Sequence, residues 1–574
     1  MYNQNLYHER LIKMKDIKGY ECKHVVYAPS RFKNSDLLVI KEYIHKKDGS
    51  IIPNLRLIKD FQRDFYITHP LHKKHKTKKE FENINHCQKF TCAQYQLPNA
   101  IRNAVGYGSF DNNLRMLFND PYLYGASVRT PVILKKMYLD KFPDLKTPNS
   151  VAVLDIETDE ISEYKTHVKD NKVPIYICLS FRNKVFLGVL ERFIQHIENP
   201  IEKLKSKAEE LLGEIFKQRN IELTIEVFKT PGKMCKKTFD YAHQWKPDFI
   251  SAWNISFDLP IIMNTLEKEG YDLAEVFSDP KIPKEYKFFY YKKGRDKQIT
   301  DTGKFKPIPS SQRWEKFWFP ATFQLVDSMQ TYRKIRSASQ NEKYSLDFQL
   351  NKHLGIRKLK FDFANHVSGI DWHRFMQKNY PIEYGIYNIF DCIGVELFDE
   401  KLKDLSLTLT TLLGYSELQT YESQPSMLLD KLHFFALENN HVLGTNPINR
   451  YEDVDEFVID TKGWILTLST HLTESNGLHC LKEFNHLKTF IRTYVADADL
   501  TSAYPSGQVF LNISRETTFR EMVKIGSLNK EHQKQLGLNL TETRANALMV
   551  CNEIFKLPQL SKIDELYLKY KEKM

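Results

Sequence analysis

Two acidic side chains, Asp155 and Glu157, follow a short apolar run that begins at Val151. If this run is a β-strand, residues two apart point to the same face of the sheet, so both carboxylates project together. Neighbouring carboxylates repel each other, and a bound cation is the usual compensation. The alternative is a surface strand end that carries two solvated acids.

Two later stretches of the sequence favour a bound cation over solvated surface acids. Asp258 lies where a predicted strand turns into a helix, and Asp391 lies on a second predicted helix, four residues after Tyr387. Side chains four residues apart share one face of a helix. Four carboxylates can meet at one point only where cations bind, and Mg²⁺ and Mn²⁺ prefer carboxylate oxygens.

Two such ions about 3.5–4 Å apart hydrolyse phosphodiesters, since one lowers the pKa of a bound water and the other stabilises the leaving oxygen. We therefore expect a catalytic site for two Mg²⁺ or Mn²⁺ ions, with Tyr387 orienting the attacking water through its hydroxyl. The expected ligands are Asp155, Glu157, Asp258 and Asp391.

The region that holds these acids, residues 150–405, alternates predicted strands and helices, which is typical of an α/β or α+β domain. Strands are predicted at Ser150–Asp155, Val173–Phe181, Lys184–Leu190, Ile221–Phe228 and Asp248–Trp253. Helices are predicted at Ile201–Arg219, from near Leu259, at Leu346–His353, at Ile382–Leu405, and then at Leu407–Leu413 and Pro425–Asn439.

A basic aromatic insertion, residues 279–320, interrupts this pattern. Its aromatic residues stand among many lysines and include Tyr286, Phe288, Phe289, Tyr290, Tyr291, Trp314 and Trp318. Aromatics interleaved with cations suit a single nucleic-acid strand, through base stacking and phosphate pairing. The equal alternative is a hairpin whose aromatics pack on the domain.

Residues 1–150 have a mixed, basic and irregular pattern, and a linker with two prolines, residues 141–150, ends this region. A solvated basic face that touches phosphates is the favoured interpretation of its polar stretch, and a zinc site is the alternative, although the spacings match no standard ligand pattern. The residues concerned are Lys73, Lys74, Lys76, Lys78 and Lys79, with His69, His72, His75, His86, Cys87 and Cys92.

The composition limits the class of protein. The chain has 574 residues, 42% of them hydrophobic, which excludes a disordered protein and allows several domains. Its formal net charge of +11 favours an anionic partner, nucleic acid first. The eight cysteines form no disulfide-like framework, and no apolar run approaches the ~18 residues of a membrane span, so we expect a soluble intracellular protein.

The acid-bearing runs are similar to known motifs. Asp155–Thr158, Asn254–Pro260 and Tyr387–Asp391 resemble, in this order, the three exonuclease motifs of family B DNA polymerases. Asp499–Ser506 resembles the first palm motif of the same family. Two shorter runs resemble segments of the replicative polymerases of tailed bacteriophages, namely Val26–Phe32 and Asn512–Thr517.

The resemblance implies a ribonuclease H-like fold for residues 150–405 and a 3′–5′ proofreading exonuclease in which the four acids hold the two metals. It also implies a polymerase site in which Asp499 holds Mg²⁺. In that site, backbone amides near Ser502 and Ala503 would meet the incoming dNTP, and Tyr504 would lie under the sugar and exclude a 2′-hydroxyl.

The chain also departs from the family. The interval from Asn254 to Asp258 is one residue shorter than the commonest spacing, and Ala503 replaces the usual leucine beside the nucleotide pocket. The family's Lys-x-x-x-Asn-Ser-x-Tyr-Gly helix and Tyr-Gly-Asp-Thr-Asp-Ser hairpin are missing, and the nearest match, Asp301–Gly303, lies in the insertion. Palm chemistry needs a second aspartate and a cation.

We therefore expect the N-terminal part of a phage-type family B polymerase, in the cytoplasm of an infected bacterium. The expected domains are an N-terminal DNA-contacting domain (1–149), the exonuclease (150–405), a partial palm (406–530) and a helical tail at the start of the fingers (531–574). Expected partners are primer–template DNA, single-stranded 3′ ends, dNTPs, a second polypeptide with the rest of the polymerase, and a sliding clamp. The alternatives are a stand-alone 3′–5′ exonuclease and a non-catalytic DNA-binding scaffold subunit.

Overall fold

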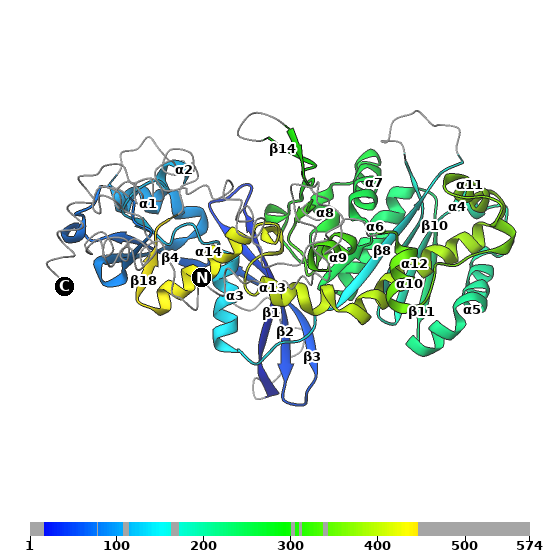
Figure 1. Cartoon of the computed structure of the whole chain (residues 1–574), viewed down its shortest axis with the longest axis horizontal. Coiled ribbons are helices and arrows are strands. Elements are labelled where there is room, and N and C mark those ends of the chain that lie inside the picture. The colour runs from blue at the N-terminus through cyan, green and yellow to red at the C-terminus, as the bar shows by residue number, and fades with distance from the viewer. Residues whose placement is uncertain are drawn as a thin grey trace, which may run out of the picture. The chain divides into compact units, whose positions relative to one another are not determined.

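The structure is a computed structural model that describes residues 16–76, 78–106, 114–161, 172–299, 305–308, 313–336 and 343–445. All of these belong to the first of the two units into which the chain divides, Met1–Asn446. The second unit, Pro447–Met574, lies outside the described residues. The described part is a mixed α/β structure with several sheets, as the sequence predicts (Figure 1).

The N-terminal region is more regular than its sequence pattern indicates, and the strands found there were not predicted. One antiparallel sheet has the order β1-β2-β3 and a second the order β6-β4-β7. The elements are β1 (Ile17–Pro29), β2 (Asp36–Lys46), β3 (Ile51–Lys59), β4 (Gln62–Thr68), β5 (Phe81–Asn83), β6 (Cys87–Ala93), α1 (Leu97–Val105), α2 (Leu114–Leu117), β7 (Leu123–Tyr124) and α3 (Thr130–Lys141).

The central domain is built on a six-stranded sheet with the order β11-β10-β9-β8-β12-β17. Its strands are β8 (Val151–Thr158), β9 (Pro174–Phe181), β10 (Lys184–Leu190), β11 (Glu222–Phe228), β12 (Phe249–Ala252) and β17 (Gln324–Asp327). Strands β8, β12 and β17 run parallel, so their carboxyl ends lie at one edge of the sheet. The five strands predicted here are confirmed within a few residues, and β17 was not predicted.

Helices cover both faces of this sheet (Figure 1). On β8, alternate residues face opposite cores: Val153 packs with α12 (Pro381–Leu402), whereas Leu154 packs with α6 (Pro231–Trp245) and α7 (Ile255–Lys268). The helix predicted from near Leu259 begins earlier, at Ile255. The other helices of the domain are α4 (Glu191–Ile194), α5 (Pro200–Arg219), α8 (Leu273–Phe277), α9 (Ser328–Arg336), α10 (Leu346–Leu354) and α11 (Ile370–Asn379).

In the basic aromatic insertion, most of the aromatic side chains pack on the domain. Tyr286 and Trp314 are buried, Phe289 stacks on Phe277 with ring centroids 4.4 Å apart, and Tyr291 stacks on Phe317 at 5.1 Å. The packing alternative therefore holds for these side chains, whereas Tyr290 is 55% exposed. The short strands here are β13 (Tyr290–Lys292), β14 (Lys297–Ile299), β15 (Phe305–Pro307) and β16 (Lys316–Trp318).

After α12 the chain returns to the N-terminal region. A π-helical turn leads into α13 (Leu409–Leu413) and α14 (Gln424–Glu438), where two helices were predicted, and β18 (His441–Leu443) then pairs with β5. Six cysteines of the described part are free thiols. None of its helices is long and apolar enough to cross a membrane.

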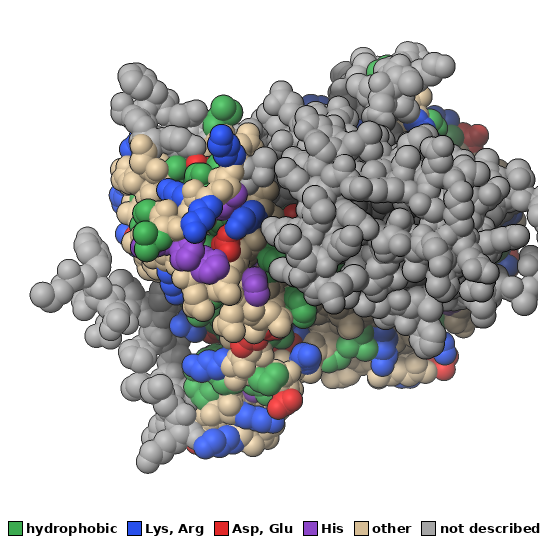
Figure 2. Space-filling view, turned by 60° about the vertical axis from the view of Figure 1, so that its left-hand side comes forward, with side chains coloured by type: hydrophobic (Ala, Val, Ile, Leu, Met, Phe, Trp, Pro, Cys, Tyr) green, Lys and Arg blue, Asp and Glu red, His purple; other side chains and the backbone are tan. Residues whose placement is uncertain are grey.

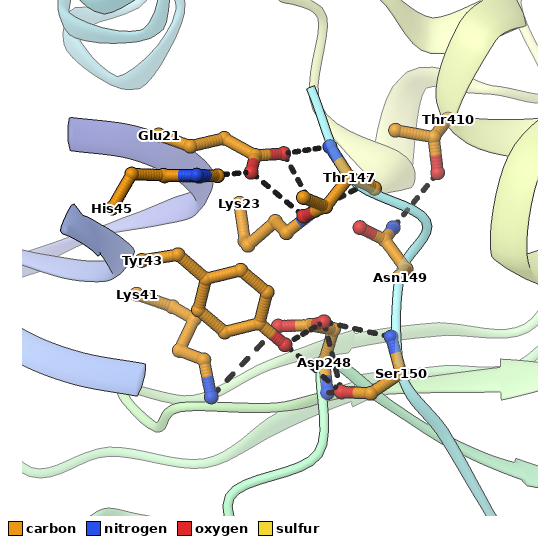
Figure 3. Close-up of polar contacts among 10 residues, drawn as sticks. All are labelled: Glu21, Lys23, Lys41, Tyr43, His45, Thr147, Asn149, Ser150, Asp248 and Thr410. Atoms are coloured by element: carbon orange, nitrogen blue, oxygen red, sulfur yellow. Dashed lines mark hydrogen bonds and ion pairs between the residues drawn. The ribbon is translucent and has the colours of Figure 1, made fainter. Parts of the chain in front are cut away.

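A buried polar network joins the β1–β3 sheet to the central sheet (Figure 3). The Oδ2 atom of Asp248 accepts hydrogen bonds from the Tyr43 hydroxyl at 2.6 Å and from the Ser150 backbone N–H at 2.8 Å. Its Oδ1 atom lies 3.8 Å from the Lys41 ammonium. A neighbouring cluster contains Glu21, Lys23, His45 and Thr147. Asp248, which directly precedes β12, is therefore held to the β1–β3 sheet by a hydrogen bond and an ion pair.

Candidate metal centre

The four predicted acids come from three elements at the carboxyl edge of the parallel strands. Asp155 and Glu157 lie on β8, on the face that packs against α12. Asp258 lies in the first turn of α7, directly after β12, and Asp391 lies in the middle of α12. The strand periodicity that predicted a shared face for Asp155 and Glu157 agrees with this placement.

Three of these carboxylates converge. Asp155, Glu157 and Asp391 each offer an oxygen, and these three oxygens lie within 4.8 Å of one another. Among the residues that the structure describes, this is the one group of three or more His, Cys, Asp or Glu side chains so close together. We call Asp155, Glu157, Asp258 and Asp391 the acid cluster; Asp258 belongs to it by sequence and charge but lies outside the 4.8 Å group.

The electrostatics show that all four acids influence one another. Burial raises the pKa of Asp155 well above its usual value, and the charges of Asp258, Asp391 and Glu157 raise it further. Burial also raises the pKa of Asp258, as do the carboxylates of Asp327 and Glu157. Neighbouring negative charges in a buried place disfavour ionisation unless a cation compensates them.

Lys358, which follows α10, is the protein's own cation in the acid cluster. Its ammonium donates to Asp391 Oδ2 and, at 2.9 Å, to the Tyr387 hydroxyl. Burial opposes the charge of Lys358, but the carboxylates of Asp391 and Asp155 outweigh this effect and hold its pKa well above the usual value. Sequence reasoning missed Lys358, because its spacing to the acids follows no local pattern.

Tyr387 lies beside the acids, as predicted, and its ring packs on Trp372 with centroids 4.9 Å apart. Burial is the main cause that raises the pKa of Tyr387, with the Asp391 carboxylate as the next, so the hydroxyl keeps its proton. Because its oxygen accepts from Lys358, that proton remains available to an acceptor in the site.

Two further residues on α12 were missed, although a signal for them exists. The Asn388 amide donates to Asp155 Oδ2 at 2.6 Å, and the Tyr384 hydroxyl donates to Glu157 Oε2. Together with Tyr387 and Asp391 they have the spacing i, i+3, i+4, i+7, which is one stripe of a helix. Between Tyr384 and Val395 the remaining residues of α12 are apolar or glycine, so this stripe marks the face that meets the carboxylates.

Asp327, at the end of β17, is a third missed residue. Its Oδ2 accepts from the backbone N–H of Ile255 at 3.0 Å, at the start of α7, and its Oδ1 accepts from that of Gln330 at 2.6 Å, in the first turn of α9. Burial raises the pKa of Asp327 to about 7. Asn254, whose role the motif spacing left open, is exposed at the N-cap of α7 and caps no backbone N–H with its side chain.

The donor set fits divalent cations. All the candidate ligand atoms are carboxylate oxygens, which hard cations such as Mg²⁺ and Mn²⁺ prefer. The Oδ1 atom of Asp391 is buried and has no hydrogen-bond partner among the described residues. Four carboxylates face one lysine, so the acid cluster has more acidic groups than cations among the described residues and keeps at least one free acceptor for a cation.

The zinc alternative in the N-terminal region receives no support from the geometry. The rings of His72 and His86 are stacked 4.1 Å apart, but His86 bonds to Glu82 and His75 faces the Pro121 carbonyl. The favoured basic face is partly exposed, and Figure 2 shows lysine, arginine and histidine side chains close together on one face of the molecule. Within it, Lys79 is ion-paired with Glu82.

The predicted polymerase-site residues lie outside the described residues; they are Asp499, Ser502, Ala503 and Tyr504. Comparison with models of known protein families gave no match, and no curated protein matched the sequence.

Proposed function

We propose that residues 150–405 form a metal-dependent nuclease that removes nucleotides from the 3′ end of DNA, in a ribonuclease H-like fold. The observation that carries this proposal is the convergence of Asp155, Glu157 and Asp391 oxygens within 4.8 Å at the edge of a sheet. The proposed substrate, DNA, and the proposed 3′–5′ direction come from the order and content of the three motifs, which resemble those of family B DNA polymerases.

In this proposal the acid cluster holds two Mg²⁺ or Mn²⁺ ions. When bound, such ions lower the pKa of a water molecule and stabilise the leaving oxygen of a phosphodiester. The protein positions the ligands: Asn388 and Tyr384 hold the carboxylates of Asp155 and Glu157, and Lys358 fixes Asp391. The Tyr387 hydroxyl, held by Lys358, is placed to orient a water.

The test is digestion of a 5′-labelled primer–template in the presence of Mg²⁺. We expect the full chain to shorten the primer from its 3′ end, and the variant Asp155→Ala/Glu157→Ala to bind DNA without shortening it. Asp240→Ala, which removes an exposed carboxylate on α6, is the matched control and should digest normally. Digestion by the double variant at the wild-type rate would refute the site.

The polymerase half of the family resemblance stays a prediction. A split polymerase predicts that this chain extends a primer with dNTPs only when a second polypeptide supplies the missing palm residues, and that Asp499→Ala leaves digestion intact. Extension by this chain alone would mean that it completes a palm site. DNA binding without shortening or extension would favour the scaffold alternative.

A further inference from the structure

A cavity of about 360 Å³ lies away from the acid cluster, and none of the four acids lines it. Its wall comes from β1, β4, the segment after β7, β16, β17 and the turn after α13. We call it the Arg63 cavity; the lining residues used below are Arg63, Gln94, Ser127, Phe317, Trp318 and Phe323. Its volume is at the lower end of the ~300–1,000 Å³ typical of ligand sites, which suits one ring system and one acidic group.

The lining of the Arg63 cavity includes a buried cation that has no counter-ion among the described residues. Arg63 is 2% exposed, and among the described residues no carboxylate lies within ion-pair distance of it. Its guanidinium donates to the Val128 carbonyl at 2.6 Å, the Gly125 carbonyl at 3.0 Å and the Gln94 side chain at 2.7 Å. These acceptors are neutral, and the buried Nε has no hydrogen-bond partner in the part of the chain that the structure describes.

Burial of a guanidinium without a counter-ion disfavours its charged form, and the pKa of Arg63 reflects this. Burial lowers the pKa of Arg63 to about 10. The other arginine of the lining, Arg129, is instead neutralised by Glu417 at 2.5 Å and Asp430 at 3.3 Å. Buried charges in folded proteins are normally paired, so an unpaired arginine beside a cavity indicates an anionic partner that enters it.

The lining also contains an accessible aromatic side chain, Trp318 on β16, which is partly exposed. Phe317 and Phe323 lie at the same cavity, but their rings are buried in the core that packs against α6 and α7. Aromatic side chains bind planar rings through stacking, and arginine binds phosphate and carboxylate groups. We propose that the Arg63 cavity binds a small planar aromatic anion about the size of a nucleoside monophosphate. This site does not depend on the proposed nuclease.

The test uses 2′-deoxyadenosine 5′-monophosphate as the probe, with the full chain in EDTA and in the Asp155→Ala background, so that the acid cluster does not contribute. Calorimetric titration should show saturable binding of the probe. Deoxyadenosine, which lacks the charge, should bind about tenfold more weakly. Absence of binding by both compounds would overturn the proposal.

Three variants locate the binding. Trp318→Ala should weaken it about tenfold, from the loss of one stacking contact, whereas Trp245→Ala, a partly exposed tryptophan outside the cavity, should not. Ser127→Phe fills the cavity and should abolish binding while the unfolding temperature is kept. Arg63→Met should make the monophosphate and the nucleoside bind alike. If Arg63→Met does not fold, Trp318→Ala and Ser127→Phe still show whether the probe binds in the cavity. Wild-type affinity for the probe in Ser127→Phe would overturn the proposed site.

Discussion

The ion pair of Lys41 and Asp248 offers a quantitative test of how the β1–β3 sheet is attached to the central domain. Both side chains are buried, at 0% and 1% exposure, and their charged atoms are 3.8 Å apart. Burial lowers the pKa of Lys41 to about 8 although Asp248 opposes this shift, so the lysine is charged near neutral pH. Lys41→Met therefore leaves a buried carboxylate without its cation.

The size of the effect follows from the geometry. Two unit charges at this distance attract each other by about 4 kcal/mol at an effective dielectric constant of about 20. Removal of one partner of a buried pair costs about 3–5 kcal/mol, because the other charge stays buried. Asp248 keeps its bonds from Tyr43 and Ser150, so we expect the free energy of unfolding to fall by about 3 kcal/mol.

The assay is urea unfolding of the full chain near neutral pH, followed on the first transition. In the double variant Lys41→Met/Asp248→Asn no isolated charge remains, so it should be more stable than the sum of the single effects predicts, by about 2 kcal/mol. Lys236→Met, which breaks an exposed pair with Asp240, is the control and should change stability by less than about 1 kcal/mol. Strict additivity of the two buried substitutions would refute the reasoning.

Three further predictions concern the site and the folded state. Lys358→Met should lower the rate of DNA digestion about 10–100-fold, because Asp391 loses the group that fixes it. Lys358→Arg should keep part of the digestion rate. The measurement is the digestion rate at a series of Mg²⁺ concentrations. Mg²⁺ should raise the unfolding temperature of the wild type but not of Asp155→Ala/Glu157→Ala, since a ligand bound only by the folded state stabilises it. Burial lowers the pKa of His433 from 6.5 to about 4, so the unfolded chain binds this proton first and stability is lost as the pH falls through that window. His433→Leu should therefore show a shallower loss of unfolding temperature there; an unchanged slope would contradict this.

The sequence predicts the central sheet well because its strands are short apolar runs bounded by turns, and such runs are recognisable locally. The N-terminal sheet was missed for a physical reason. Strand β2 contains Lys41 and Glu42, which resemble surface residues in the sequence but are buried. Their partners, Asp248 and the Tyr138 hydroxyl, lie far along the chain, so no local pattern reveals that these charges are compensated.

The same distinction applies to the acid cluster. Asp155, Glu157, Asp258 and Asp391 are predictable, because a strand period, a strand–helix junction and a helix period place them. Lys358 and Asp327 are not, since Lys358 meets Asp391 and Asp327 lies near Asp258 only through tertiary packing. The four acids, and the Tyr384 and Asn388 side chains on the same helix stripe as Asp391, can thus be found from sequence, whereas Lys358 and Asp327 need coordinates.

This division bears on what the acid cluster is for. Lys358 neutralises one oxygen of Asp391 and leaves the other, Oδ1, buried without a partner among the described residues. A purely structural cluster would be more stable if a second lysine or a neutral side chain replaced one acid, because unpaired buried charge is costly. Asn388, Tyr384 and Lys358 hold Asp155, Glu157 and Asp391, and among the described residues Lys358 is the one lysine or arginine paired with these acids. The proposed metal ions would supply the positive charge that the acid cluster lacks in the described part of the chain. This is why the loss of Mg²⁺-dependent stabilisation in Asp155→Ala/Glu157→Ala, measured without any DNA, tests the metal centre separately from the chemistry proposed for it.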